Sequence, residues 1–177
     1  MIADFVKIDA VPEEIIIEYE GKIPSVFIDF WKTYGFGSFY NGYLKSINPH
    51  DYQDILKKSY FQGNVSIPLF ATAFGDLITW EKNRFLGIVK YRYGDNDVIS
   101  EGADFFFQDL DDGELDDEVF SIKQYKKAIE KFGTLEYDEC FGYVPLLALG
   151  GKESVNNLNK VKIREHIVLI NELCGEV

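Results

Sequence analysis

One short stretch of the chain, DLDDGELDDE from Asp109 to Glu118, places seven carboxylates within ten residues. Hard cations such as Ca²⁺ are bound by several carboxylates on a short flexible loop, so the stretch is a candidate calcium loop. In the register of an EF-hand, however, Gly113 falls at the fifth position, where an oxygen ligand belongs, and Glu114 falls at the sixth, which needs glycine. The spacing does not predict a calcium site. A solvated acidic loop is the simpler interpretation, with weak binding of a divalent ion left open.

Two glycine-containing stretches could in principle cradle a phosphate. In LALGGKES, a P-loop would need glycine where Leu146 stands and Ser or Thr where Glu153 follows the lysine. In YGFGSFYNGY, residues 34–43, a dinucleotide fingerprint would need a third glycine at Tyr40 and a strand in front, whereas a helix is expected there. Neither stretch predicts a phosphate site. The second is interpreted as a glycine helix stop and a turn, with these rings as packing anchors: Phe36, Phe39 and Tyr43.

Side chains for nucleophilic or acid–base catalysis are sparse. The two histidines, His50 and His166, lie at the start of one expected helix and in the middle of another, and the chain has no HExxH or GxSxG pattern. Cys140 and Cys174 are far apart and form no CxxC pair, so both are expected to be buried free thiols. We therefore predict that the protein is not an enzyme and uses no cofactor and no metal.

Charge is distributed very unevenly along the chain. The formal net charge is −12, and residues 93–122 hold 11 acids and no Lys or Arg, whereas the other 147 residues hold 19 acids and 18 bases. Such a region repels nucleic acid and anionic membranes and attracts basic partners. The candidate partner-binding residues are its densest acids: Asp109, Asp111, Asp112, Glu114, Asp116, Asp117 and Glu118.

Composition indicates a globular α+β protein. Of the 177 residues, 46% are apolar, which is enough for a sizeable core, and 15 Phe and 11 Tyr supply bulky anchors for it. No apolar run approaches the roughly 20 residues that span a bilayer, and the first residues lack a basic leader with an apolar block, so a cytoplasmic location is expected. We predict a central antiparallel sheet flanked by helices, with a small C-terminal helical or mixed lobe.

The elements expected from local patterns are as follows. Apolar spacing and a closing glycine predict a helix over residues 23–34, and Asn48-Pro49 predicts the start of a second one. Residues 67–100 are rich in β-branched and aromatic residues broken by turn signals, which predicts three or four antiparallel strands. Within them, IVKYRY is expected to be a half-exposed strand with Lys90 and Arg92 on one face.

The C-terminal part is expected to contain two helices. Apolar spacing predicts a helix over residues 121–132, and a stripe from Leu158 to Cys174 predicts a packed final helix. A domain boundary, if present, falls near residues 114–120. We therefore divide the chain into residues 1–113 and 114–177, with one compact unit as the alternative.

Several of these packing patterns, taken as a set, resemble a known family. IPSVFIDFWKTYGFGSFYNGYLKSINPHDY and PLFATAFGDLITWE resemble the GAD-like domain. FGYVPLLALGGKESVNNLNKVKIREHIVLI resembles the small C-terminal domain that accompanies it in the immunity proteins of type VI secretion DNase effectors. The resemblance covers residues 23–173, with the pieces in the same order. A weaker similarity, to SMI1/KNR4-like immunity domains, rests on the IP…W…YG start and on Gly75-Asp76 before Trp80.

The resemblance implies a cytoplasmic immunity protein that binds a cognate toxin, a basic nuclease, and holds it inactive. An acidic binder suits this role because a nuclease presents a basic face to DNA phosphates. Two alternatives stay open: the acidic loop only confers solubility while the partner docks on an aromatic-rich face, or the chain is a small-ligand or nucleotide-sensing domain. A nucleic-acid role, suggested by the GAD name alone, is disfavoured by the negative charge.

Overall fold

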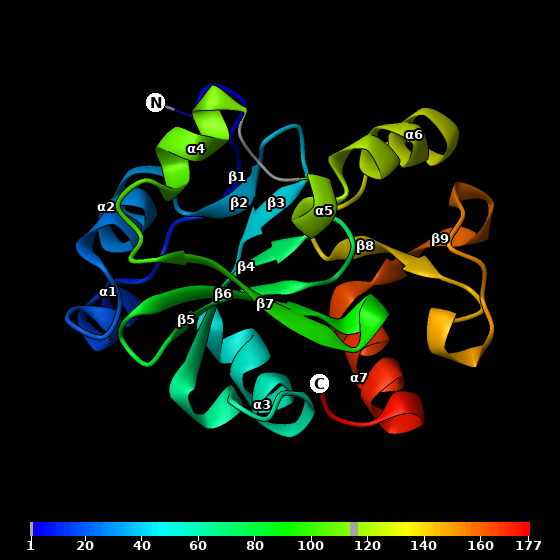
Figure 1. The fold of residues 1–177 in the computed structure, drawn as a ribbon. Coiled ribbons are helices and arrows are strands. Elements are labelled where there is room, and N and C mark those ends of the chain that lie inside the picture. Colours follow the sequence, from blue (N-terminus) through cyan, green and yellow to red (C-terminus); the bar gives the residue numbers. More distant parts are fainter. Residues whose placement is uncertain (1, 114–116) are drawn as a thin grey trace.

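The computed structural model describes residues 2–113 and 117–177 and shows a seven-stranded antiparallel sheet with helices on both faces (Figure 1). The strands are neighbours in chain order, so every connection joins adjacent strands. The strands are β1 (Val6–Asp9), β2 (Phe36–Phe39), β3 (Leu44–Ser46), β4 (Ser66–Thr72), β5 (Leu77–Glu81), β6 (Phe85–Lys90) and β7 (Asp95–Glu101). A second, two-stranded sheet pairs β8 (Glu139–Tyr143) with β9 (Leu158–Lys162).

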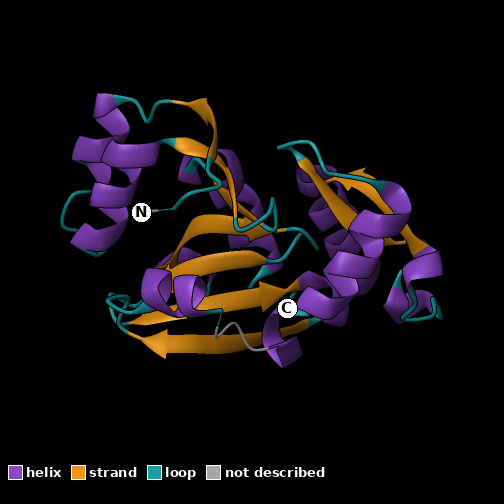
Figure 2. Cartoon of the chain, turned by 90° about the horizontal axis from the view of Figure 1, so that it is seen from above, coloured by secondary structure: helices purple, strands orange, loops and turns teal. Residues whose placement is uncertain are grey.

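The helices divide between the two faces of the large sheet and the C-terminal segment. Seen from above, the helices and short strands of that segment gather beside the large sheet (Figure 2). None of the helices in the described part of the chain is long and apolar enough to cross a membrane. The α-helices are α1 (Glu13–Tyr19), α2 (Ser25–Tyr34), α3 (Pro49–Ser59), α4 (Phe106–Asp112), α5 (Asp117–Phe120), α6 (Ile122–Phe132) and α7 (Ile163–Cys174).

Each face of the sheet buries its own apolar cluster because successive residues of a strand point to opposite sides. Ile78 and Ile88 belong to the larger cluster, under α1, α2, α4 and α6, whereas Leu77 and Val89 belong to the smaller one, under α3 and α7. The central strands β4, β5 and β6 are therefore buried on both faces, while the edge strand β1 is exposed along its whole length.

Aromatic rings form the centre of the larger cluster. Phe70 of β4 is fully buried, and its ring centroid lies 5.5–5.8 Å from those of Phe27, Phe30, Phe39 and Phe106. Aromatic pairs in these tilted and edge-on geometries add to the stabilisation from burial alone. The cluster draws rings from α2, β2, β4 and α4, so it fixes these elements together.

The structure confirms the predicted α+β class and most of the predicted elements. The helix over residues 23–34 is α2, closed by Gly35 at φ 89°. The second helix is α3, in which the Asn48 side chain accepts a hydrogen bond from the His50 amide. Residues 66–101 form four antiparallel strands, and α6 follows Ser121 as expected.

Three predicted elements are wrong. IVKYRY is not a half-exposed strand, because β6 ends at Lys90 and residues 91–93 form a 3₁₀ turn that buries Arg92. The stripe over residues 158–174 is not one helix, because Leu158–Lys162 is β9, paired with β8, and α7 begins only at Ile163. Residues 36–39, interpreted as a turn, form β2, although their rings are buried as predicted.

The Phe70→Ala variant should lower the free energy of unfolding by about 3–5 kcal/mol, because it leaves a cavity among four rings that cannot all move inward. Urea unfolding followed by tryptophan fluorescence measures this loss. Phe61→Ala is the matched control, since Phe61 is 61% exposed, and it should cost less than about 1 kcal/mol. Equal losses in the two variants would contradict a ring cluster centred on Phe70.

Candidate functional site

The predicted acidic residues lie mainly on α4, which stands on the large aromatic cluster. Phe106 and Leu110 are buried, and the ring of Phe107 stacks on that of Phe30 with centroids 4.8 Å apart. These anchors leave the opposite side of the helix to solvent. The exposed acids of α4, here called the α4 acids, are Asp109, Asp111 and Asp112.

Of the other predicted acids, the structure describes Asp117 and Glu118, both on α5. Asp117 accepts a hydrogen bond from the Lys123 amide at 2.8 Å and forms an ion pair with the Lys123 side chain at 3.4 Å. The amide hydrogen bond lowers the pKa of Asp117, the Lys123 charge adding to it, so this carboxylate caps the start of α6. Glu118 is exposed on α5. Glu114 and Asp116 lie outside the described residues.

An exposed aromatic residue stands at the start of α4, and the sequence did not single it out. Phe105 is 68% exposed, whereas the next residue, Phe106, is 3% exposed. Asp104 precedes it and is also exposed. Aromatic side chains are enriched in protein interfaces, so this exposed ring is a candidate contact for a partner. The run ADFFFQ contains three adjacent phenylalanines, and only the packing shows which one faces solvent.

The edge strand β7 precedes α4 and carries further acids, two of which form ion pairs with basic side chains. Asp97 lies 3.5 Å from the Lys90 ammonium and Glu101 lies 2.9 Å from the Arg84 guanidinium. Val98 between them is 55% exposed. Among the described acids of residues 93–122, Asp97, Glu101 and Asp117 form ion pairs, and the α4 acids form none with described residues.

A buried ion pair lies where the large sheet meets the C-terminal segment. Arg92 is 6% exposed and Asp76, in the turn between β4 and β5, is fully buried, with 3.2 Å between Nε and Oδ2. The guanidinium lies over the rings of Phe74 and Tyr93, at 4.1 and 4.8 Å from their centroids. Its Nη2 donates to the Ser121 hydroxyl at the start of α6. Burial raises the pKa of Asp76 to about 6 and Arg92 opposes that shift.

Tyrosine hydroxyls and one close backbone approach complete this junction. Tyr125 donates to the Asn41 carbonyl at 2.7 Å, Tyr137 to the Ser46 carbonyl at 2.7 Å, and Tyr43 to the Phe120 carbonyl. The Phe141 amide of β8 donates to the Ala73 carbonyl at 2.7 Å. Gly75 has φ 77°, and a Cβ there would lie 2.9 Å from the Cys140 sulfur, so only glycine lets the β4–β5 turn approach β8 this closely.

The histidines and cysteines are not brought together into a catalytic arrangement. His50 is half-exposed and lies 2.8 Å from a Glu18 oxygen, while His166 is buried, which lowers its pKa. Cys140 is buried as predicted, and burial raises its pKa to about 12, but Cys174 is exposed, so the prediction of two buried thiols is wrong for it. Over the described ranges, no three His, Cys, Asp or Glu side chains are grouped so as to hold a metal ion.

Comparison with protein families bears on the residues just described. Residues 2–90, which include β1 to β6 and the aromatic cluster, match the GAD-like domain model. The chain belongs to the GAD-like domain family. Residues 100–174, which carry α4 and the C-terminal segment, match the model of the T6SS immunity protein Tdi1, C-terminal. Both predicted resemblances are confirmed, and the match of the second segment places this GAD-like protein among type VI secretion immunity proteins.

A solved structure has the same overall fold. The crystal structure of Atu4351 from Agrobacterium tumefaciens matches with a TM-score of 0.72 at 17% sequence identity, over 94% of this chain and 84% of the other. At this identity the likeness shows the fold alone. No curated protein matches the chain. The division at residues 113 and 114 stays a prediction.

The Arg92→Met variant should lose about 3–5 kcal/mol of stability at pH 8, because it leaves the Asp76 carboxylate buried without its partner. The loss should shrink at pH 5. The folded-state pKa of Asp76, already raised to about 6, rises further without Arg92 and stays above its unfolded value, so protonation increasingly favours the folded variant as pH falls. Urea unfolding at the two pH values measures both effects.

The double variant Arg92→Met/Asp76→Asn is the control for this prediction. It removes both charges, so it should be more stable than Arg92→Met at pH 8. Its own free energy of unfolding should not depend on the titration of this carboxylate. If Arg92→Met showed the same deficit at both pH values and the second substitution restored nothing, the ion pair would have no part in the junction's stability.

Proposed function

We propose that this protein binds a cognate secreted toxin, a DNase, and holds it inactive through an acidic surface centred on α4. The observation that carries the proposal is the match of residues 100–174 to the C-terminal model of a type VI secretion immunity protein, in a chain that also has the GAD-like segment. On this proposal the protein has no catalytic role and acts in the cytoplasm. Residues 1–113 and 114–177 would act together as one binding unit.

Electrostatics supports an acidic surface as the binding face. A DNase must attract phosphates, so the path that holds its substrate carries basic residues. A surface of the opposite sign steers association and disfavours wrong partners. The proposed surface contains the α4 acids and Phe105, with Glu118 on α5; the sequence adds the predicted Glu114 and Asp116, which lie outside the described residues. Asp117 contributes mainly by holding the start of α6.

The placement of the α4 acids supports a role outside the fold. Asp111 and Asp112 lie in the last turn of α4, where the helix dipole disfavours negative charge, whereas Asp109 lies in the first turn. Their carboxylates are exposed. Residues that destabilise their own helix and do not contribute to the core are better explained by a role in binding a partner than by a role in stability.

Reversing the α4 acids should weaken toxin binding without unfolding the protein. The variant Asp109→Lys/Asp111→Lys/Asp112→Lys should raise the Kd for the toxin encoded beside the gene by at least about tenfold at low salt. Isothermal titration calorimetry at two salt concentrations measures this, and co-expression with the toxin reports whether protection is lost. Helix α4 should persist, since Lys is a good helix former and suits the last turn at positions 111 and 112.

The matched control reverses three exposed acids on other elements: Asp29→Lys/Glu130→Lys/Glu172→Lys. It changes the net charge equally, so a general charge effect would weaken binding in both variants. Full binding and protection by the α4 variant would sink the acidic-surface proposal. A neighbouring toxin that binds tightly but cleaves no DNA would leave the immunity role intact and overturn the DNase assignment.

Phe105→Ala should weaken the same complex by about 1–3 kcal/mol, mainly through faster dissociation, because an exposed ring flanked by acids fits the centre of an interface. Surface plasmon resonance measures the dissociation rate. Leu149→Ala, which truncates a side chain that is 56% exposed in the C-terminal segment, is the control and should leave the rate unchanged. Unchanged dissociation of the Phe105 variant would remove this ring from the interface.

A further inference from the structure

Helix α6 carries a basic surface on a chain whose net charge is −12. Its sequence, IKQYKKAIEKF, contains four lysines and one acid, Glu130, and it buries Tyr125 and Ala128 on the opposite side. The four lysines are all exposed: Lys123, Lys126, Lys127 and Lys131. Positive charge is thus gathered on the outer face of one helix, where it favours an acidic partner.

Two of these lysines have charges that nothing in the described part of the chain balances. Lys123 forms an ion pair with Asp117 at 3.4 Å, and Lys131 donates a hydrogen bond to a side-chain amide at 2.6 Å. Lys126 and Lys127 form no ion pair or hydrogen bond with a described residue. Both lie near the middle of α6, so the part of its basic surface that is available to a partner is central.

A groove lies beside these lysines, between α6 and the turn that joins β2 to β3. It has a volume of about 470 Å³, and its apolar lining includes Tyr40, Ile122 and Ile129. The Tyr125 hydroxyl donates to the Asn41 carbonyl at 2.7 Å and so holds the turn against the helix. An apolar cavity of about 150 Å³ is known to bind benzene, so this groove has room for a phenyl ring.

The exposed side of α4 offers a ring and carboxylates that match this groove and these lysines. Phe105, at the start of α4, is 68% exposed. Asp109 and Asp112 follow it by four and seven residues, which puts all three on one side of the helix. On α6, Lys126 belongs both to the basic surface and to the lining of the groove. A ring in the groove would therefore bring the carboxylates that follow it close to Lys126 and Lys127.

A second copy of the chain can satisfy both surfaces at once. Helices α4 and α6 both pack on the larger apolar cluster, so they lie on the same side of the large sheet, and Figure 1 shows α5 between them. A two-fold axis that passes between the helices places α4 of each copy against α6 of the other. Each copy then contributes the same surface, as closed two-fold dimers require.

We propose that two copies of this chain associate through such a two-fold interface, with Phe105 of each copy in the groove of the other and the α4 acids facing Lys126 and Lys127. The association itself does not depend on the toxin. Its consequence rests on the proposed function: the same α4 residues would bind the toxin, so self-association and toxin binding exclude each other. The dimer is then a form of the protein from which the toxin draws single copies.

Sedimentation velocity of the protein alone measures the association. At about 0.15 M salt, screening over about 8 Å limits the repulsion between the two net charges, and the wild-type protein should pass from monomer to dimer between about 5 and about 500 µM. Lys126→Glu/Lys127→Glu, the α6 variant, should raise the Kd at least about tenfold, and so should the α4 variant that reverses all three α4 acids to Lys. Lys57→Glu/Lys58→Glu, in two exposed neighbouring lysines of α3 on the other face of the large sheet, is the matched control and should associate normally.

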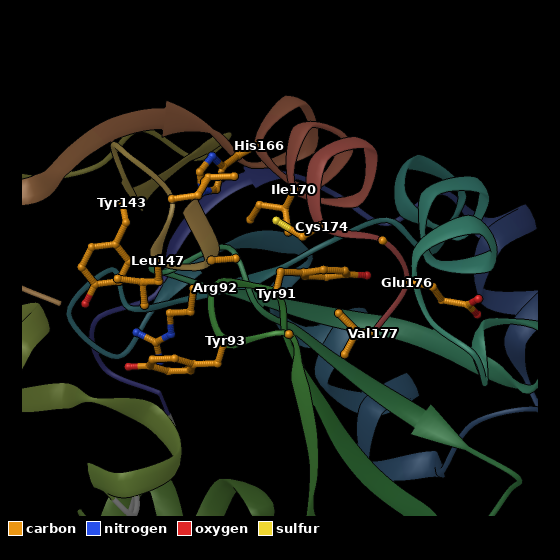
Figure 3. A pocket seen from close by; sticks show the side chains of 14 residues that line it. Tyr91, Arg92, Tyr93, Tyr143, Leu147, His166, Ile170, Cys174, Glu176 and Val177 are labelled. Carbon is orange, nitrogen blue, oxygen red and sulfur yellow. The ribbon is translucent and has the colours of Figure 1, made fainter. Parts of the chain in front are cut away.

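A mixture of the α4 and α6 variants tests the pairing directly. In a mixed dimer the reversed α4 faces the reversed α6, and the two unreversed helices face each other, so both contacts again join opposite charges. The mixture should therefore form a dimer that neither variant forms alone. Cys174 lets one variant be followed, because its thiol is exposed at a cavity whose described lining includes no residue of α4 or α6 (Figure 3). Cys140 is buried, so a maleimide dye marks Cys174 alone, and the dye reports the sedimentation of that variant with and without the other.

The outcomes separate this proposal from the proposed function. A wild-type protein that stays monomeric at about 500 µM would overturn the self-association, as would a mixture of the two variants that sediments as monomers, or equal losses in the α3 control and the α6 variant. Adding the purified toxin should convert the dimer into a complex with one copy of each protein. If the toxin instead bound the intact dimer, the self-association would stand, and the α4 acids would be lost as the toxin-binding surface.

Discussion

The burial of Arg92 beside Asp76 is the constraint around which the two parts of the chain are arranged. A guanidinium removed from water needs charge compensation and hydrogen-bond acceptors, and no single element here supplies them all. Asp76 comes from the β4–β5 turn, and Ser121 comes from the start of α6. The guanidinium also lies over two rings, Phe74 from the β4–β5 turn and the neighbouring Tyr93. Strand β6 ends at Lys90, two residues before Arg92. The 3₁₀ turn that follows directs the Arg92 side chain toward these partners.

Much of the fold could be predicted because its signals are local. Gly35 closes α2 and Asn48 caps α3, and neither signal depends on the rest of the molecule. By contrast, Leu158–Lys162 has spacing compatible with a helix and becomes a strand only because β8 is beside it. The burial of Arg92 likewise depends on Asp76, sixteen residues earlier, which no periodicity reveals.

The candidate site divides in the same way. The negative charge of the region could be read from composition, since it needs no coordinates. Composition could not show which of these side chains remain available to a partner. Asp117 is engaged with α6, and Phe105 rather than Phe106 faces solvent, and both facts follow from how α4 and α6 pack. Salt screens exposed charges more strongly than the buried Asp76–Arg92 pair, so added salt should affect the associations of the α4 acids more than this pair.

The tyrosine hydrogen bonds across the junction affect how the sequences of proteins with this fold can change. Tyr43, Tyr125 and Tyr137 all donate to main-chain carbonyls rather than to side chains. Every residue type offers a carbonyl, so the residues at the receiving positions can change freely while the contact is kept. In each of these contacts, the residue that supplies the carbonyl can change while the tyrosine is kept. This tolerance is compatible with a shared fold at 17% identity, and it leaves the surface residues free to follow a changing partner.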